Sequence, residues 1–429
     1  MKRLLPLLLL GIPYFLLAQS SRTSIPVNFS PLGNAWQSVA QPVDLSDVEP
    51  FLAYSIAWEG TGEALSIRFS ADGVAWGEWE RCERDRHEIE GEVIKYTVLG
   101  FADKEMQFFQ LRSQEPVEAA TLHAFSPGAS PRPSLSPGSS AGARACPCPL
   151  PGFQAREDWC PSGDCPAHPN PAFSTVTHII IHHTATSNSS SDWAAVVRSI
   201  WDTHVNTRGW SDIGYNWLID PDGMIYQGRG NDWIGAHFCS TNTNTMGVAM
   251  LGTFTEVLPQ AATLQSLREL VAWKVCESDL DPLGEAFHPS SSLVLPHISG
   301  HQDGCATECP GAVFYPTLPT LRQEIEGYLV ENCNSDPTST PSLFSEVNVQ
   351  LFPNPMRGSG NINITAPVSG VVDVRLFSTK QQQLLALQAT LQAGRPAQLA
   401  FDVGHLAKGV YWVYLSHREG NGVFKLLKI

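Results

Sequence analysis

Two segments that lie far apart in the chain carry the side chains that zinc prefers. One is the strand-like run 177–184 and the other is the segment 301–309. Zinc that catalyses hydrolysis is typically held by three protein ligands, such as two histidines and a cysteine, and keeps a fourth position open to water. His182, His301 and Cys309 would supply such a set.

Amide hydrolysis is a reaction that such a site supports. Bound zinc lowers the pKa of its water to about 7 and polarises a carbonyl group as a Lewis acid. The run 177–184 contains two adjacent histidines, His182 and His183, and neighbouring residues of a strand point to opposite faces. One of the two would therefore bind metal while the other packs, and strand periodicity alone does not decide which.

Length and charge limit the kinds of protein that can carry this site. A chain of 429 residues is too long for one ordinary core, so we expect several domains. The chain has 42 acidic and 27 basic side chains, and charged residues make up only 16% of the total. This acidic balance disfavours nucleic acids and anionic membranes as partners.

The N-terminus has the features of a signal peptide. Lys2 and Arg3 precede an apolar stretch, residues 4–17, which is followed by Ala18. We expect residues 1–18 to be removed on export. No other stretch approaches the roughly 20 apolar residues that a membrane-spanning helix needs. The mature protein should therefore be secreted, without stable membrane insertion.

Ten cysteines in an exported chain predict disulfide bonds, because the compartment is oxidising. If Cys309 is a zinc ligand, nine cysteines remain and at least one has no partner within the chain. Cys82 is expected to be that one, since it stands alone in the N-terminal region. The other eight lie between residues 146 and 333 and could close up to four bridges, whose connectivity the sequence does not give.

The N-terminal third is predicted to be rich in β-structure. Runs of alternating apolar and polar residues recur over 25–126, with turn residues at Asp72-Gly73, which is typical of a β-sandwich-like module. Its tryptophans could stack on sugars, which would make glycan adhesion a rival main function, although core positions are the simpler expectation. Residues 127–170 are rich in Pro, Ser and Gly, contain cysteines, and are predicted to form a linker.

The central region 171–333 alternates the signals of strands and helices. We predict a multidomain chain in which this region is an α/β domain, with a mixed central β-sheet flanked by helices. The predicted strands are 177–183, 215–227 and 246–252, and the predicted helices are 192–204, 260–277 and 317–330.

A polar spacer, 334–346, separates this domain from a C-terminal block, 347–429, that is predicted to be a second β-sandwich. The block contains the motif Leu-Phe-Pro-Asn-Pro at 351–355 and ends in the alternating run 423–429. These features resemble the C-terminal sorting domain of type IX secretion in Bacteroidetes. The resemblance implies an export signal whose partner is the type IX secretion machinery, and the alternative is a generic binding module.

Five segments of the central domain resemble, in order, segments of the peptidoglycan recognition protein family. This family shares its fold with N-acetylmuramoyl-L-alanine amidases of the phage lysozyme type. The matching segments are 181–185, 212–216, 228–230, 234–237 and 301–310.

The resemblance assigns roles to individual positions. It implies that His182 is the metal-binding member of the histidine pair, with His301 and Cys309 as the other ligands of zinc. Tyr215 matches a tyrosine that points at the zinc-bound water. Thr307 stands two residues before Cys309, at an active-site position of the family. Tyr215 and Thr307 are therefore the expected catalytic residues.

Further positions are expected to bind substrate: His183, Arg229, Trp233 and His237. Arg229 could contact a peptide carboxylate, or it could form a structural ion pair. The family distinguishes lysine-type from diaminopimelate-type stem peptides near Asp232 and Trp233. Trp233 favours diaminopimelate, whereas Asp232 fits neither type.

The resemblance thus implies a secreted, zinc-dependent N-acetylmuramoyl-L-alanine amidase. Such an enzyme hydrolyses the amide between N-acetylmuramic acid and the L-alanine of peptidoglycan, so peptidoglycan and muropeptides would be its binding partners. A protein that recognises peptidoglycan without hydrolysing it is the alternative. The complete set of predicted zinc ligands favours the enzyme.

Overall fold

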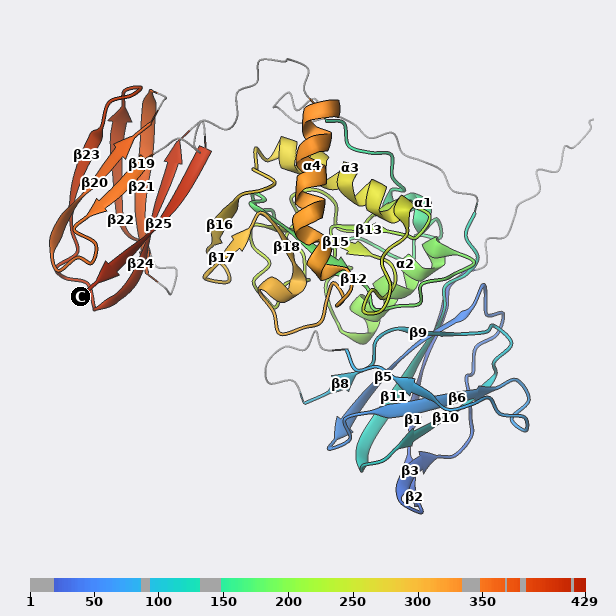
Figure 1. Ribbon diagram of the computed structural model, residues 1–429. Helices are drawn as coiled ribbons and strands as arrows, with labels where there is room; N and C mark the ends of the chain where they lie inside the picture. The colour runs from blue at the N-terminus through green and yellow to red at the C-terminus, as the bar shows by residue number, and fades with distance from the viewer. Residues whose placement is uncertain are drawn as a thin grey trace, which may run out of the picture.

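Three folded parts follow one another along the chain (Figure 1). The computed structural model describes residues 19–85, 93–131, 148–333, 348–366, 369–378, 383–417 and 420–429. The predicted signal peptide, 1–18, and the predicted spacer, 334–346, lie outside the described residues.

The N-terminal module consists of two antiparallel sheets that share one core. Alternation along the strands turns Ile56 and Leu122 of one sheet toward Ile67 and Leu111 of the other, and all four are fully buried. The first sheet contains β1 (Ser21–Val27), β5 (Leu52–Gly60), β8 (Lys95–Tyr96), β9 (Gly100–Ala102) and β11 (Val117–Ser126). The second contains β2 (Phe29–Leu32), β3 (Ala35–Ser38), β4 (Gln41–Pro42), β6 (Leu65–Ser70), β7 (Glu80–Cys82) and β10 (Phe108–Ser113).

The central domain is built on a mixed five-stranded sheet. Its order is β14 (Ile225–Gln227), β13 (Trp217–Ile219), β15 (Thr245–Met250), β12 (His178–His183) and β18 (Ile298–Gly300). Only β14 runs antiparallel to its neighbour. The single strand predicted over 215–227 is two strands, because the Asp220 carboxylate accepts hydrogen bonds from the Asp222 and Met224 amides and closes a tight turn between them.

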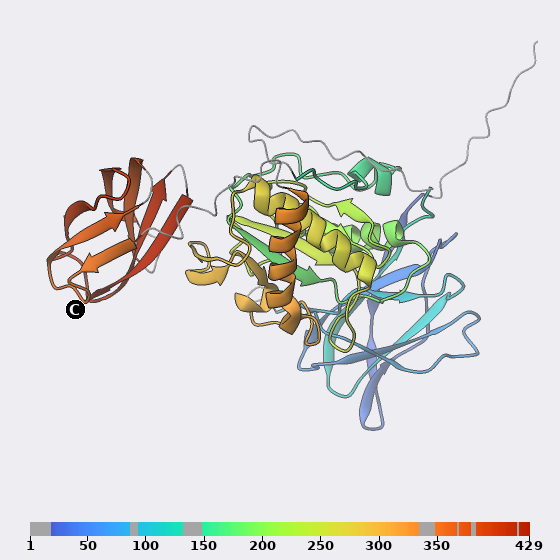
Figure 2. The ribbon, with the colours of Figure 1, turned by 45° about the horizontal axis from the view of Figure 1, so that its top comes forward.

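Helices cover both faces of this sheet. On one face lie α3 (Ala261–Glu277) and α4 (Leu318–Asn332), which lie next to each other in Figure 2. On the other face lies α2 (Trp193–Asp202), which continues as a π-helical turn, Thr203–Thr207. The Asp192 carboxylate accepts a hydrogen bond from the Ala195 amide and so caps α2.

Much of the predicted linker is part of the central domain, so this prediction was wrong for residues 148–170. Helix α1 (Arg156–Trp159) packs on the domain, and the Trp159 side chain is fully buried. Disulfides join Cys148 to Cys333 and Cys160 to Cys165. These crosslinks and the buried indole outweigh the turn-forming composition that suggested a spacer. The remainder of the predicted linker, 132–147, lies outside the described residues.

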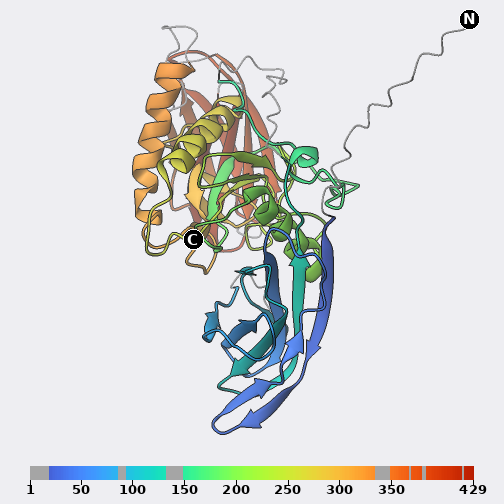
Figure 3. The ribbon, with the colours of Figure 1, turned by 90° about the vertical axis from the view of Figure 1, so that its right-hand side faces the viewer.

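The N-terminal module is docked on α2, and Figure 3 shows β11 ending beside this helix. The buried guanidinium of Arg198 donates hydrogen bonds to the carbonyl oxygens of Pro127 (2.8 Å) and Gly128 (2.6 Å), just after β11. Phe51 and Leu99 of the module pack against the apolar side chains of α2. The two domains are therefore joined by a hydrogen-bonded and apolar interface.

The C-terminal block is also formed by two sheets. Met356, Ile362, Val374 and Val413 lie in a single core between them. The first sheet contains β19 (Asn348–Phe352), β20 (Ser359–Thr365) and β23 (Ala397–Asp402); the second contains β21 (Gly370–Ser378), β22 (Gln383–Leu391), β24 (Gly409–His417) and β25 (Gly420–Lys428). Among the helices of the described residues, none has the length and apolar character needed to cross a membrane.

Candidate metal centre

Three side chains from separate segments meet at the carboxyl end of two neighbouring parallel strands. His182 lies near the end of β12, His301 follows β18 directly, and Cys309 lies in the loop beyond the short 3-10 helix His301–Asp303. Their ligand atoms all lie within 4.8 Å of one another, and the exposed fractions of the three residues are 0%, 1% and 1%. The sheet thus brings together the three predicted metal ligands.

A chain of hydrogen bonds fixes which nitrogen of His182 faces the centre. The Thr245 hydroxyl donates to the Asn242 carbonyl (2.7 Å), so it accepts from Nε2 of His237 at 3.3 Å. Nδ1 of His237 is then the acceptor in its 3.0 Å hydrogen bond with Nε2 of His182. Nδ1 of His182 is therefore the unprotonated ring nitrogen, and it lies 3.7 Å from the Cys309 sulfur.

This arrangement is the one that a metal-binding histidine requires. Histidine ligands commonly donate their second ring N–H to a neighbouring acceptor, which sets the tautomer and the ring orientation. His237 was predicted to bind substrate. It lines the cavity beside the centre, but its imidazole also orients the ligand His182.

A second cysteine near His301, Cys305, is not available as a ligand. Cys305, four residues after His301, forms a disulfide with Cys239, whose sulfur lies 3.9 Å from Nε2 of His301. Cys82 and Cys309 are the free cysteines among the described residues, as the cysteine count predicted. Because a disulfide sulfur offers no thiolate, Cys309 is the sulfur ligand that the centre can use.

The surroundings of Cys309 fit a metal-bound thiolate. Burial raises the pKa of the Cys309 thiol well above its usual range, so the thiolate needs a bound cation to be stable in this site. The backbone N–H of His183 points at the sulfur from 3.3 Å and would stabilise its negative charge. Two imidazoles and one thiolate are a typical donor set for catalytic zinc.

Tyr215 lies over the centre, with its ring centroid 5.3 Å from that of His182. Burial also raises the pKa of Tyr215 well above its usual value, so its hydroxyl stays protonated and can donate a hydrogen bond. The absence of a side chain at Gly228 allows the backbone to pass close to the Tyr215 carbonyl oxygen. The Arg229 amide donates a 3.0 Å hydrogen bond to this oxygen and so helps to hold Tyr215 in place. The Thr307 hydroxyl accepts a 3.2 Å hydrogen bond from the Cys309 amide.

Two of the predicted substrate-binding residues make structural contacts, and their role in substrate binding stays a prediction. Arg229 donates hydrogen bonds to the carbonyls of Ile213 (2.7 Å) and Ile234 (2.8 Å), so its guanidinium joins two loops. His183 points to the opposite face of β12 from His182, where its Nδ1 accepts a hydrogen bond from the Phe254 amide at 3.3 Å. The alternation of the strand is the physical reason.

Trp233 is half-buried and meets the exposed ring of Phe173 edge-on, at 5.6 Å between centroids. Its predicted role in substrate binding stays a prediction. The neighbouring Asp232 forms an ion pair with Lys274 at 2.6 Å. This contact gives Asp232 a structural role.

Other residues at the site were not predicted from the sequence. Asp85 and the segment 97–99 belong to the N-terminal module, yet they line the same cavity as Tyr215 and His237. Nothing in their local sequence distinguishes them from ordinary loop and strand-end residues. By contrast, Thr245 lies a few residues after the segment 234–237, on a strand that pairs with β12. This position could have suggested that it supports the residues of the site.

Comparison with known proteins identifies two of the three folded parts. Residues 172–312 match the family described as N-acetylmuramoyl-L-alanine amidase. Residues 350–428 match the family described as secretion system C-terminal sorting domain. The second match confirms the predicted sorting domain and implies export to the cell surface or beyond.

Individual relatives agree with the first match. The chain is 33% identical over 156 residues to N-acetylmuramoyl-L-alanine amidase of Sus scrofa, covering 35% of this chain and 24% of that protein. It is 34% identical over 138 residues to peptidoglycan-recognition protein SC1a of Drosophila melanogaster, covering 32% of this chain and 68% of that protein. A solved structure of wild-type Drosophila PGRP-LB is 30% identical, covers 39% of this chain and 91% of that one, and gives a TM-score of 0.33. The chain spans between 23% and 28% of the mammalian amidases that it matches.

Proposed function

This chain belongs to the peptidoglycan recognition protein family, and on that basis we propose that it is an exported, zinc-dependent N-acetylmuramoyl-L-alanine amidase. Its substrate would be peptidoglycan or muropeptides, cleaved between the lactyl group of N-acetylmuramic acid and the first L-alanine. The sorting domain supports action outside the cell, after export through the type IX secretion system.

The observation that carries this proposal is the buried set of His182, His301 and Cys309. A protein that only recognises peptidoglycan has no need for a ligand nitrogen whose tautomer is fixed. Here the hydrogen bonds from Thr245 through His237 place the ring proton of His182 on Nε2, so that its unprotonated Nδ1 is the atom suited to bind a cation. We therefore assign the three side chains to a catalytic zinc ion.

Zinc bound there would supply a water of lowered pKa and would polarise the scissile carbonyl. The protein's own contribution is to orient the ligands and to donate hydrogen bonds. The protonated hydroxyl of Tyr215 is suited to stabilise the negative charge that develops on the carbonyl oxygen. The Thr307 hydroxyl accepts from the Cys309 amide, which leaves its own proton available to a substrate or water oxygen.

The test is release of free stem peptide from purified soluble muropeptides by the full mature chain. Release should stop with a chelator and return with added zinc. Cys309→Ala should abolish both zinc binding and release. Cys82→Ala is the matched control, because it removes the other buried free thiol, in the core of the N-terminal module.

Two results would change the assignment. Full activity in Cys309→Ala would remove this cysteine from the catalytic centre. Binding of muropeptide without cleavage, by folded protein that contains zinc, would favour the recognition-only alternative.

A further inference from the structure

A cavity beside the candidate metal centre is too small to hold the proposed substrate. We call it the metal cavity, because its lining residues Tyr215 and His237 contact His182, although the three proposed ligands do not line it themselves. Its volume is about 50 Å³, and its walls include Tyr215 and His237 of the central domain. Leu99 and Asp85 of the N-terminal module also line it. A water molecule takes about 30 Å³ in the liquid, and ligand pockets commonly measure about 300–1,000 Å³. Only the reacting group of a muropeptide can therefore enter this cavity.

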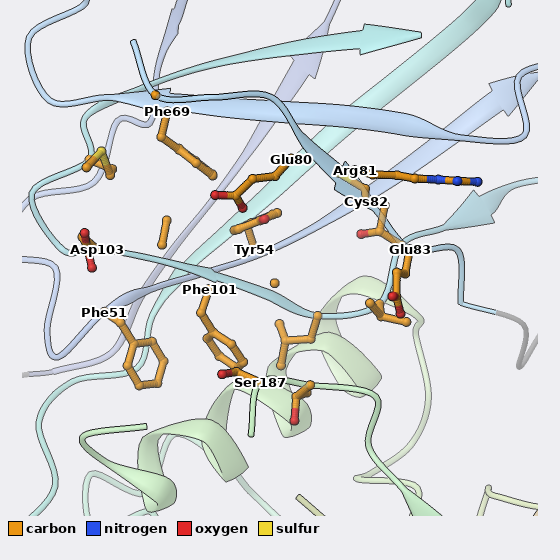
Figure 4. A pocket seen from close by; sticks show the side chains of 18 of the residues that line it. Phe51, Tyr54, Phe69, Glu80, Arg81, Cys82, Glu83, Phe101, Asp103 and Ser187 are labelled. Carbon is orange, nitrogen blue, oxygen red and sulfur yellow. The ribbon is translucent and has the colours of Figure 1, made fainter. Parts of the chain in front are cut away.

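A second cavity adjoins the first and is large enough for the rest. It lies between the N-terminal module and the central domain, and its volume is about 800 Å³. Both cavities are lined by the module segment 97–99 and by Ala185 and Thr186, which follow β12 closely. Figure 4 shows Phe101 of the module and Ser187 of the central domain side by side in this pocket.

Contacts between the domains hold the two walls of this interdomain pocket in place. Arg208 forms an ion pair with Asp85 of the module, beside the small cavity. Arg22 of β1 forms a second ion pair with Asp202 of α2, at 3.6 Å. Phe101 is in the apolar interface with α2 and lines the pocket as well. The module is therefore a fixed part of the pocket.

We propose that the interdomain pocket binds the body of a short, soluble muropeptide while its scissile amide enters the metal cavity. This inference rests on the proposed amidase function. The lining suits such a ligand, because aromatic rings such as Phe51 and Phe101 offer faces to a sugar and the Glu80 carboxylate accepts hydrogen bonds from hydroxyl or amide groups. A pocket walled by two domains favours a fragment over intact, crosslinked peptidoglycan.

The test uses bulky substitutions that fill the interdomain pocket from the central domain or from the module, each made in the full mature chain. Ser187→Trp acts from the central domain and Ala71→Trp from the module, and both positions are exposed and line the pocket. Ser30→Trp, at an exposed position on β2, is the matched control. Hydrolysis is measured on a disaccharide tetrapeptide and on N-acetylmuramoyl-L-alanine, which contains little beyond the scissile bond.

Each filling variant should raise KM for the disaccharide tetrapeptide by about tenfold or more, while KM for the minimal substrate stays within about twofold. Ser30→Trp should change neither value. Equal loss on both substrates, with zinc content unchanged, would overturn the proposal, because the variants would then disturb the catalytic cavity itself. Unchanged KM on both substrates in both filling variants would overturn it as well.

A third variant tests whether the N-terminal module helps to bind the substrate or instead blocks its access to the site. Arg208→Ala weakens the interface beside the metal cavity, and Lys104→Ala removes an exposed ion pair within the module as its control. If the module is a wall, Arg208→Ala should raise KM for the disaccharide tetrapeptide. Faster hydrolysis in Arg208→Ala would show that the module obstructs the site, which contradicts the proposal.

Failure of the proposed function would be recognised separately. If the wild-type protein binds zinc and hydrolyses neither substrate, equilibrium binding of the disaccharide tetrapeptide to the wild type and to Ser187→Trp still tests the pocket. Weaker binding by the variant would support the pocket as the binding site. Equal binding would overturn it.

Discussion

Gly247 lies against the imidazole of His237: a Cβ atom at this glycine would stand 2.6 Å from Cγ of the ring. The glycine belongs to β15, opposite Ile180 of β12, so neither strand can move aside without breaking the sheet. The position of the ring that orients the proposed metal ligand His182 therefore depends on the absence of a side chain at Gly247 of β15.

Gly247→Ala should displace His237 and weaken zinc binding. Loss of a partner that orients a metal ligand typically costs about 10–100-fold in metal affinity, and we expect a loss in that range from zinc titration. Gly327→Ala is the control, since a Cβ atom there meets nothing within 4 Å on an exposed face of α4. Unchanged zinc affinity in Gly247→Ala would mean that His237 does not orient the metal ligand.

Tyr215→Phe should separate metal binding from catalysis. The hydroxyl is not among the proposed zinc ligands, so zinc content should stay at the wild-type level. Removal of a donor that stabilises a developing oxyanion lowers kcat by about 10²–10³-fold. Steady-state kinetics together with metal analysis test this, and a wild-type kcat in the variant would exclude the hydroxyl from the reaction.

Arg229→Ala should act on stability rather than on substrate binding. Its guanidinium donates hydrogen bonds to the carbonyl oxygens of Ile213 and Ile234, which would lose these partners in the variant. Leaving a buried polar group without a partner costs about 1–3 kcal/mol. We expect the free energy of unfolding to fall by about 2–4 kcal/mol, with KM nearly unchanged. Arg268→Ala, which removes a partly exposed ion pair with Glu324, should cost less than about 1 kcal/mol. A large rise in KM without loss of stability would instead indicate that Arg229 binds substrate.

A cluster of buried histidines should make the protein less stable in acid. Burial, together with the neighbouring His288 and His297, lowers the pKa of His178 from 6.5 to about 3. The folded state therefore favours the neutral ring, and this contribution is complete above pH 6.5 and is lost as the pH falls toward 3. At pH 5 the loss should be about 2 kcal/mol, from about 1.4 kcal/mol per pH unit.

His178→Gln tests this contribution, because glutamine cannot titrate. Between pH 7.5 and 5, chemical denaturation should show a drop in unfolding free energy that is about 2 kcal/mol smaller in the variant than in the wild type. Parallel pH profiles for the two proteins would show that His178 does not contribute.

The sequence was sufficient to locate the candidate metal centre because the segments around its residues resemble those of a known family, whereas strand alternation alone left the choice between His182 and His183 open. His182, His301 and Cys309 come together as predicted. The hydrogen bonds of Arg229 could not be predicted from its motif, since the carbonyls that it binds are brought near only by the path of two loops. Composition also misled over 148–170, where crosslinks and one buried indole decide the structure.

The contribution of the N-terminal module to the candidate site could not be predicted from the sequence, because it also depends on contacts between distant segments. Its own strands follow a regular alternation, and core residues such as Ile56 and Leu111 point to one shared interior, as a sandwich requires. Asp85 and Leu99, however, gain their importance from the surface that they meet after docking. Such a relationship between domains leaves no periodic signal in either sequence segment.

The disulfide between Cys148 and Cys333 joins the two ends of the central domain. A proteolytic cut anywhere beyond Cys333 would free the sorting block and leave this bridge untouched. Loss of the sorting domain would therefore leave intact the covalent bond that ties the end of α4 to the segment before α1.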